Sequence, residues 1–334
     1  MIGIRIGRGV RRVRGGDAPS ASLGDLGTST FSRFSADTTF TVPGTGFVAG
    51  ATVRWGGVAL PTVVNSAAQL TATVSEALLW TLGDVAVTVV NGAGGPPVAG
   101  ERTATVAWPA NAEWWYDAAL GRTMNGANVQ VLANQTPKTG RNIQQLDGAK
   151  QLPFTAVDAA YNGQPTLTVT GASFLQSPTP WVTPIPAGTR IVSFTVGAFG
   201  ALNGSQILAD GYDGTTRAYL GFSTSQGNKL YMGRTVLLLD GVFSSTAKQF
   251  LRADYNGAAS ALYSASIATP LMTGDGGGTA AAFLGRTIGA AYTGSGLMLA
   301  GGKFAIDCGF SSPTAAQVAS VMRYCANRFG ITLT

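Results

Sequence analysis

The stretch TFTVPGTGFVAGATVRWGGVAL, residues 39–60, alternates short runs of β-branched and aromatic residues with glycine turns. Such residues favour extended strands, and glycine reaches the backbone angles that tight turns require. Gly44 and Gly46 predict a turn before Phe47, whose ring can plug one end of a sandwich. Trp55-Gly56-Gly57 predicts a strand that enters a hairpin. The stretch therefore predicts β-structure made of short strands.

The same sequence pattern extends through most of the chain of 334 residues. Short runs of Val, Ile, Thr, Phe and Trp lie between Gly, Asn and Pro clusters, which predicts an all-β fold. This length accommodates two domains of about 100 to 200 residues. Only 11% of the residues are charged, so Ser, Thr, Asn and Gly must cover much of the surface, which suits packing against neighbours. No apolar run approaches the roughly 20 residues that cross a bilayer, so we expect no membrane partner.

Residues 1–30 are predicted to form an extended, arginine-rich arm, because they lack the periodicity of a helix or a buried strand. Residues 1–16 hold five arginines and no acid, which leaves about +1 of the net charge of +6 for the rest (6 minus 5). We predict that the arm anchors the protein in a groove of a protein neighbour by strand addition. The anchoring residues are Ile2, Ile4, Arg5, Ile6, Arg8, Arg11, Arg12 and Arg14. Contact with nucleic acid is a less favoured alternative, and a locally folded-back tail is another.

Residues 31–107 form the first predicted domain, with strands expected over 38–42, 51–55, 69–74 and 84–90. The opening stretch, QLTATVSEALL (69–79) and GDVAVTVVNGAGG (83–95) together resemble an IPT/TIG domain, which is an immunoglobulin-like sandwich. The resemblance implies a spacer or interaction module without chemistry of its own. The Gly- and Pro-rich residues 92–100 predict a turn or linker.

Residues 108–334 form the second predicted domain, which ends in a strand and a helix. In the strand Lys303–Phe310, alternate residues predict one face in the core and one outside it. Ser312 is the predicted N-cap of the helix, Pro313 its first residue and Gly330 its stop. The apolar face of the helix is Val318, Val321, Met322, Cys325 and Phe329.

Four stretches of this domain resemble concanavalin A-like jelly-roll domains, the lectin and glucanase type found in phage and bacterial surface proteins. They are WYDA (115–118), NGQPTLTVTGASFL (162–175), FLGRTIG (283–289) and SSPTAAQVASVMRYCANRFGI (311–331). The resemblance implies a jelly-roll sandwich, and Asn256-Gly257 predicts one of its hairpins. Cys308 and Cys325 come close if the helix covers the last strand, and two buried thiols are favoured over a disulfide.

The absence of histidine excludes Ser-His-Asp triads, Cys-His pairs and HExxH zinc sites. A glycosidase would need two carboxylates about 5 to 10 Å apart. No Glu-rich motif such as ExDxE occurs, so we expect a protein that is not an enzyme. Asp210-Gly211-Tyr212-Asp213-Gly214 offers oxygen ligands to calcium, but a β-turn is favoured there, and we expect no other cofactor.

Aromatic side chains can stack on sugar rings, and carboxylates can bind their hydroxyls. The candidate glycan-binding residues are Trp181, Tyr212, Asp210 and Asp213. The pair Trp114-Trp115 is assigned to packing instead.

These features and resemblances together predict a structural protein of a phage virion, made in the host cytoplasm. It would be a capsid decoration, a head fibre or a tail appendage that binds other virion proteins, forms a dimer or trimer, and displays its domains to host glycans. One alternative is a carbohydrate-binding adhesion module of a bacterial or phage surface protein without a capsid role. A polysaccharide depolymerase is the less favoured alternative.

Overall fold

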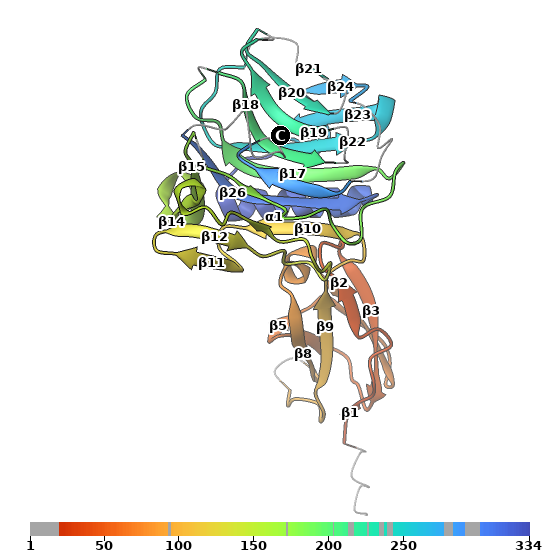
Figure 1. Cartoon of the computed structure of the whole chain (residues 1–334). Coiled ribbons are helices and arrows are strands. Elements are labelled where there is room, and N and C mark those ends of the chain that lie inside the picture. The colour runs from red at the N-terminus through yellow and green to blue at the C-terminus, as the bar shows by residue number, and fades with distance from the viewer. Residues whose placement is uncertain are drawn as a thin grey trace, which may run out of the picture. The chain divides into compact units, whose positions relative to one another are not determined.

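The computed structural model describes residues 20–92, 95–171, 173–202, 204–212, 217–225, 227–233, 237–238, 243–276, 283–290 and 301–334. The chain divides into two compact units, Met1–Ala107 and Trp108–Thr334, and the two predicted domains meet at the same position (Figure 1). Strands make up nearly all of the described regular structure, which confirms the all-β class. The predicted anchoring residues, Ile2 to Arg14, lie outside the described residues.

Unit 1 is a sandwich of two sheets, drawn in red to orange in Figure 1. The first sheet, in spatial order, is β1 (Ser22–Leu23), β3 (Thr38–Thr45), β7 (Gln69–Val74) and β6 (Thr62–Ser66). The second is β2 (Thr30–Ser32), β9 (Arg102–Ala107), β8 (Gly83–Val90), β4 (Thr52–Trp55) and β5 (Val58–Ala59), and a 3-10 helix, η1 (Glu76–Trp80), follows β7. The rings of Phe31, Phe40 and Trp55 meet edge to face between the sheets, with centroids 5.0–6.1 Å apart.

The predicted glycine turns of unit 1 are confirmed. Gly46 has a φ of 70°, and a Cβ on Gly44 would lie 2.3 Å from the ring of Phe47. Gly56 and Gly57, with φ of 53° and 85°, make the two-residue turn between β4 and β5. Two positive φ values are what a type I′ hairpin requires.

The predicted arm is too long at its C-terminal end. Leu23 is buried in unit 1 and pairs with Gly44, and Thr30 is the first residue of β2. The sequence pattern missed this because strands of two and three residues are too short to show a period.

Unit 2 consists of two antiparallel sheets that join through β12 and β14. One sheet contains β10 (Ala112–Asp117), β14 (Leu152–Asp158), β15 (Gln164–Val169), β17 (Ile191–Ala198), β22 (Gln249–Tyr255), β23 (Ser260–Ser264), β24 (Met272–Gly274) and β26 (Gly302–Ser311). The other contains β11 (Arg122–Asn125), β12 (Asn128–Leu132), β13 (Ile143–Gln144), β16 (Leu175–Gln176), β18 (Gln206–Tyr212), β19 (Arg217–Ser223), β20 (Lys229–Gly233), β21 (Leu237–Leu238) and β25 (Gly285–Ile288). Short 3-10 helices are η2 (Gly148–Lys150), η3 (Ala159–Tyr161) and η4 (Gly257–Ala259), and η4 follows Asn256 in the predicted hairpin between β22 and β23.

Strand β26 is buried on both faces, which corrects the prediction of one face outside the core. It pairs with β10, β15 and β17, so neighbouring strands cover both of its edges (Figure 1). A Cβ on Gly309 would lie 2.2 Å from the ring of Trp114, so this face packs against the interior of the sandwich. Trp114 and Trp115 are fully buried, and their assignment to packing is confirmed.

Helix α1 (Ala315–Phe329) covers the other side of this sheet, where Tyr324 lies against Trp115 with ring centroids 5.7 Å apart. Its N-cap is Thr314, which forms a capping box with Gln317, so the prediction of Ser312 as the cap is wrong by two residues. The predicted apolar face is buried, and the predicted stop at Gly330 is confirmed by its φ of 61°. Cys308 and Cys325 are both buried thiols. No helix in the described part of the chain is long and apolar enough to span a membrane.

Candidate functional site

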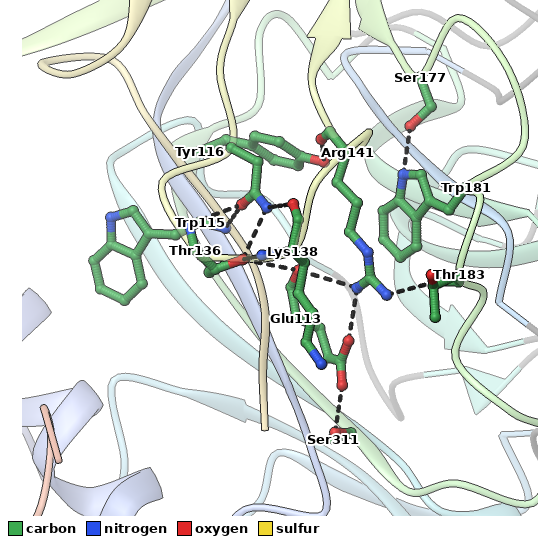
Figure 2. Close-up of polar contacts among 11 residues, drawn as sticks. Glu113, Trp115, Tyr116, Thr136, Lys138, Arg141, Ser177, Trp181, Thr183 and Ser311 are labelled. Atoms are coloured by element: carbon green, nitrogen blue, oxygen red, sulfur yellow. Dashed lines mark hydrogen bonds and ion pairs between the residues drawn. The ribbon is translucent and has the colours of Figure 1, made fainter. Parts of the chain in front are cut away.

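Trp181, a predicted sugar-stacking residue, lies in the core of unit 2 with 2% of its surface exposed. Its indole nitrogen donates to the hydroxyl of Ser177 at 3.1 Å, and the guanidinium of Arg141 lies 4.2 Å from its ring centroid (Figure 2). Trp114 and Phe283 pack against it with centroids 5.8 and 5.5 Å away. An indole enclosed on all these sides offers no face to a sugar, so the prediction for Trp181 is corrected to core packing.

Figure 2 shows that Arg141 joins several segments of unit 2. Its guanidinium donates to a carboxylate oxygen of Glu113 at 2.6 Å and to the backbone oxygen of Thr183 at 2.7 Å. The other carboxylate oxygen of Glu113 accepts from Ser311 at 2.5 Å. Arg141 is 2% exposed, so this ion pair is not open to a ligand, and removal of either partner would leave a buried charge.

A second buried ion pair joins the two sheets of unit 2. Arg286 on β25 holds the carboxylate of Asp307 on β26 in two contacts, of 2.9 and 2.6 Å. The same carboxylate accepts from Trp114 at 2.6 Å and from Thr195 at 2.7 Å. Burial acts to lower the pKa of Arg286, but the Asp307 carboxylate outweighs it and raises that pKa. Arg286 therefore stays charged, and the network fixes the interior of the sandwich.

Three more carboxylates of unit 2 pair with cations that are partly exposed. Asp117 binds Arg328, Asp158 binds Lys303 at 2.5 Å, and Asp254 binds Arg190 at 2.5 Å. Burial acts to raise the pKa of Asp158, but hydrogen bonds from Lys303 and Thr166 outweigh it and hold the pKa below its usual range. Each of these three carboxylates is paired with a cation of the protein itself.

A row of polar residues crosses the second sheet of unit 2 on the face away from the core. The row is set by strand register: Gln144 pairs with Gln176, Gln176 with Thr287, Thr287 with Asp210, and Asp210 with Tyr219. The parallel row one residue away is Leu175, Ile288, Ala209 and Leu220, all in the hydrophobic core. Because side chains alternate along a strand, the polar row faces away from that core.

One end of the polar row opens into a surface pocket of about 260 Å³. The pocket is lined by Gln144, Gln145, Leu146, Gln176 and Pro178, and Leu146 is 67% exposed. Within the described part of the chain, the buried side-chain oxygens of Gln176 and Thr287 have no hydrogen-bond partner. Buried acceptors without partners are uncommon in folded proteins, so these two oxygens call for an explanation.

The structure places the predicted glycan residues in different environments. Asp210 belongs to the polar row and is fully buried. Tyr212 is the last residue of β18, and the structure describes its backbone but not its side chain. Asp213 lies outside the described residues. Asp210 to Tyr212 are strand residues, so the β-turn predicted for residues 210–214 does not include these three, and Gly214 lies outside the described residues. Among the described residues, no group of three or more potential ligands could hold a metal ion.

Sequence reasoning missed Gln144, Gln176 and Thr287. The only local signal was the alternation of apolar and polar residues, as in Leu175-Gln176 and Thr287-Ile288. In each pair the apolar residue belongs to the hydrophobic core. Their convergence depends on pairing between residues more than a hundred positions apart, as for Gln176 and Thr287.

No protein-family model and no curated protein matches this chain. Solved structures of low similarity include a Trypanosoma rangeli sialidase with sialic acid, at 10% identity and a TM-score of 0.44, over 93% of this chain and 54% of that one. Domain 4 of an extracellular arabinanase from Geobacillus stearothermophilus, with arabinotriose, has 11% identity and a TM-score of 0.43, over 64% and 98% of the two chains. An auxiliary nutrient-binding protein from Bacteroides ovatus has 13% identity and a TM-score of 0.23, over 77% and 58%. At these TM-scores the function must be argued from the residues of this chain.

Proposed function

We propose that unit 2 binds carbohydrate through the polar row and its pocket, and that the chain is a non-enzymatic adhesion protein displayed on a larger particle. The observation that carries the proposal is the buried, unpartnered side-chain oxygen of Gln176, a residue that lines a pocket of amide side chains and pairs in register with Thr287.

Sugar hydroxyls both donate and accept hydrogen bonds, as do the glutamine, threonine and tyrosine side chains of this row. A hydroxyl that donates to Gln176 would satisfy an acceptor whose burial otherwise costs about 1–3 kcal/mol. Leu146 and Pro178 give the pocket an apolar wall for the C–H face of a sugar ring. A few placed polar groups beside an apolar wall is the usual composition of a small-molecule site.

The carboxylates of unit 2 support binding without hydrolysis. A glycosidase needs an acid of raised pKa and a second carboxylate across the bond that is cleaved. Glu113 and Asp307 are buried against arginines, and the pKa of Asp158 is lowered by Lys303 and Thr166 in spite of its burial. A carboxylate whose pKa is lowered, such as Asp158, is a poor proton donor, and Glu113 and Asp307 are each enclosed by an ion pair.

We propose that the larger particle is a phage virion. Unit 1 would serve as a spacer between the virion and unit 2. The support is the low content of charged residues, the IPT/TIG and jelly-roll resemblances, and the arginine-rich N-terminal sequence. A surface-adhesion module of a bacterium or phage without a capsid role is the alternative. Antibody labelling of purified phage particles separates a virion protein from a bacterial surface protein, because the antibody labels the particle only if the protein is part of it.

The test of carbohydrate binding is a glycan array with the full chain and with Gln176→Leu, which removes the amide and keeps most of its volume. We expect binding that falls at least roughly tenfold in the variant, equivalent to about 1.4 kcal/mol. Gln69→Leu, at an exposed glutamine of unit 1, is the matched control and should bind as the parent does. An array without any bound glycan, with and without calcium, would exclude the function. New reducing ends in bound polysaccharide would show a depolymerase instead.

A further inference from the structure

Unit 1 has an apolar surface pocket of about 290 Å³ next to two sheet edges. Val58, Leu60, Pro61, Ala77 and Leu78 supply apolar walls, and Asp37 lies among them. Val58 is 50% exposed and Ala77 is exposed. The volume is at the lower limit of ligand pockets and suits one or two aliphatic side chains.

The strands beside this pocket end their sheets. β5 is the last strand of one sheet and β6 of the other, and only Leu60 and Pro61 separate them along the chain. β6 reads Thr62-Val63-Val64-Asn65-Ser66 and contains no charge and no proline. Val63 is 62% exposed. An uncharged, β-branched edge strand presents backbone groups to which another extended strand can pair.

The electrostatics of unit 1 favour a basic partner. Residues 20–107 contain three arginines and five acids, a net charge of −2 (3 minus 5). Asp37 lines the pocket and accepts from the backbone N–H of Glu76 at 2.9 Å, so both side chains belong to the same corner of the unit. Residues 1–19 contain five arginines and Asp17, a net charge of +4 (5 minus 1).

We propose that the N-terminal segment 2–8 of a second copy of this chain docks here as an added strand. In Ile-Gly-Ile-Arg-Ile-Gly-Arg the isoleucines alternate, so an extended segment points all three to one side, toward the apolar pocket. Arg8 then lies on the same side as the isoleucines, toward Asp37 and Glu76, and Arg5 points to the opposite side. Nineteen residues extend to roughly 60 Å, which reaches a neighbouring molecule.

The segment of the same chain would have to turn back across its own sheet to reach this surface. β1, through which the chain enters unit 1, lies at the opposite edge of its sheet from β6, in the order β1-β3-β7-β6. The donor and acceptor surfaces are therefore different, and each molecule offers both. Such a head-to-tail contact builds a ring or a chain of copies.

The test measures binding of a fluorescent peptide, residues 1–8, to a full-length acceptor that carries Ile2→Ser, Ile4→Ser and Ile6→Ser. We expect saturable binding, at least roughly tenfold weaker (about 1.4 kcal/mol) when the acceptor also carries Ala77→Arg, which adds bulk and positive charge at the pocket. Asp37→Asn keeps the acceptor for the Glu76 N–H and removes the charge, so it should weaken binding and reduce its salt dependence.

Sedimentation of the full-length protein is a second test. The parent chain should self-associate, and the variant with all three isoleucines replaced should not.

The matched control is Ala49→Arg, at an exposed alanine that follows β3, whereas Asp37 precedes that strand. It adds the same charge and should leave peptide binding unchanged. Absence of peptide binding overturns the proposal, as does equal weakening by Ala49→Arg and Ala77→Arg. None of these measurements involves a glycan, so the outcome is independent of the carbohydrate function.

Discussion

At the scale of single residues, the ion pair between Arg286 and Asp307 makes the sharpest prediction. Both side chains are 0% exposed, so Asp307→Asn leaves a buried arginine without its counter-charge. We expect a loss of about 3–5 kcal/mol in the free energy of unfolding, measured with denaturant. The double variant Arg286→Met/Asp307→Leu should recover much of that loss. The exposed pair of Asp147 and Lys150 is the control, and Asp147→Asn should change stability little.

The sequence could not have revealed this pair. Asp307 alternates with apolar residues in β26, which is also the pattern of a strand with one solvent-facing side. Its partners, Trp114 and Thr195, come from β10 and β17, far away in the chain. By contrast, the turns at Gly46 and Gly56-Gly57 depend only on local backbone angles and were predicted correctly.

Asp158 predicts a dependence of stability on pH. Its folded-state pKa is lowered, with burial opposed by hydrogen bonds from Lys303 and Thr166. The stabilisation is therefore complete above the unfolded pKa of about 3.9 and is lost as the pH falls through the folded value. Unfolding of the parent and of Asp158→Asn, measured from pH 7 to pH 2, should converge at the acid end. Curves that stay parallel over that range would contradict the prediction.

At the scale of elements, helix α1 depends on its capping box. Thr314 accepts from the backbone N–H of Gln317 at 3.1 Å, and the Gln317 side chain accepts from the Thr314 N–H at 3.0 Å. Thr314→Ala should cost about 1 kcal/mol of stability, whereas Ser312→Ala, at the N-cap predicted from the sequence, should cost less. Equal losses would show that Ser312 shares the capping role.

The polar row is also a property of elements, because it exists only through the register of β13, β16, β25, β18 and β19. A one-residue slip in any of these pairings would turn its polar residue toward the core. Sequence alone predicted Asp210 as a ligand-binding residue and missed its neighbours in the row. Strand pairing between distant segments decides which residues meet, and no single segment contains that information.

At the scale of the whole molecule, each unit has its own hydrophobic core. Phe40, Trp55 and their neighbours form one cluster in unit 1, and Trp114, Ile288 and Phe304 belong to another in unit 2. Because a unit with its own core can unfold on its own, we expect two transitions in calorimetry. Gly44→Ala puts a methyl group against the Phe47 ring and the Ser22 backbone oxygen, so it should lower one transition. Asp307→Asn should lower the other transition alone. If each variant moves both transitions together, the two units unfold as one cooperative body.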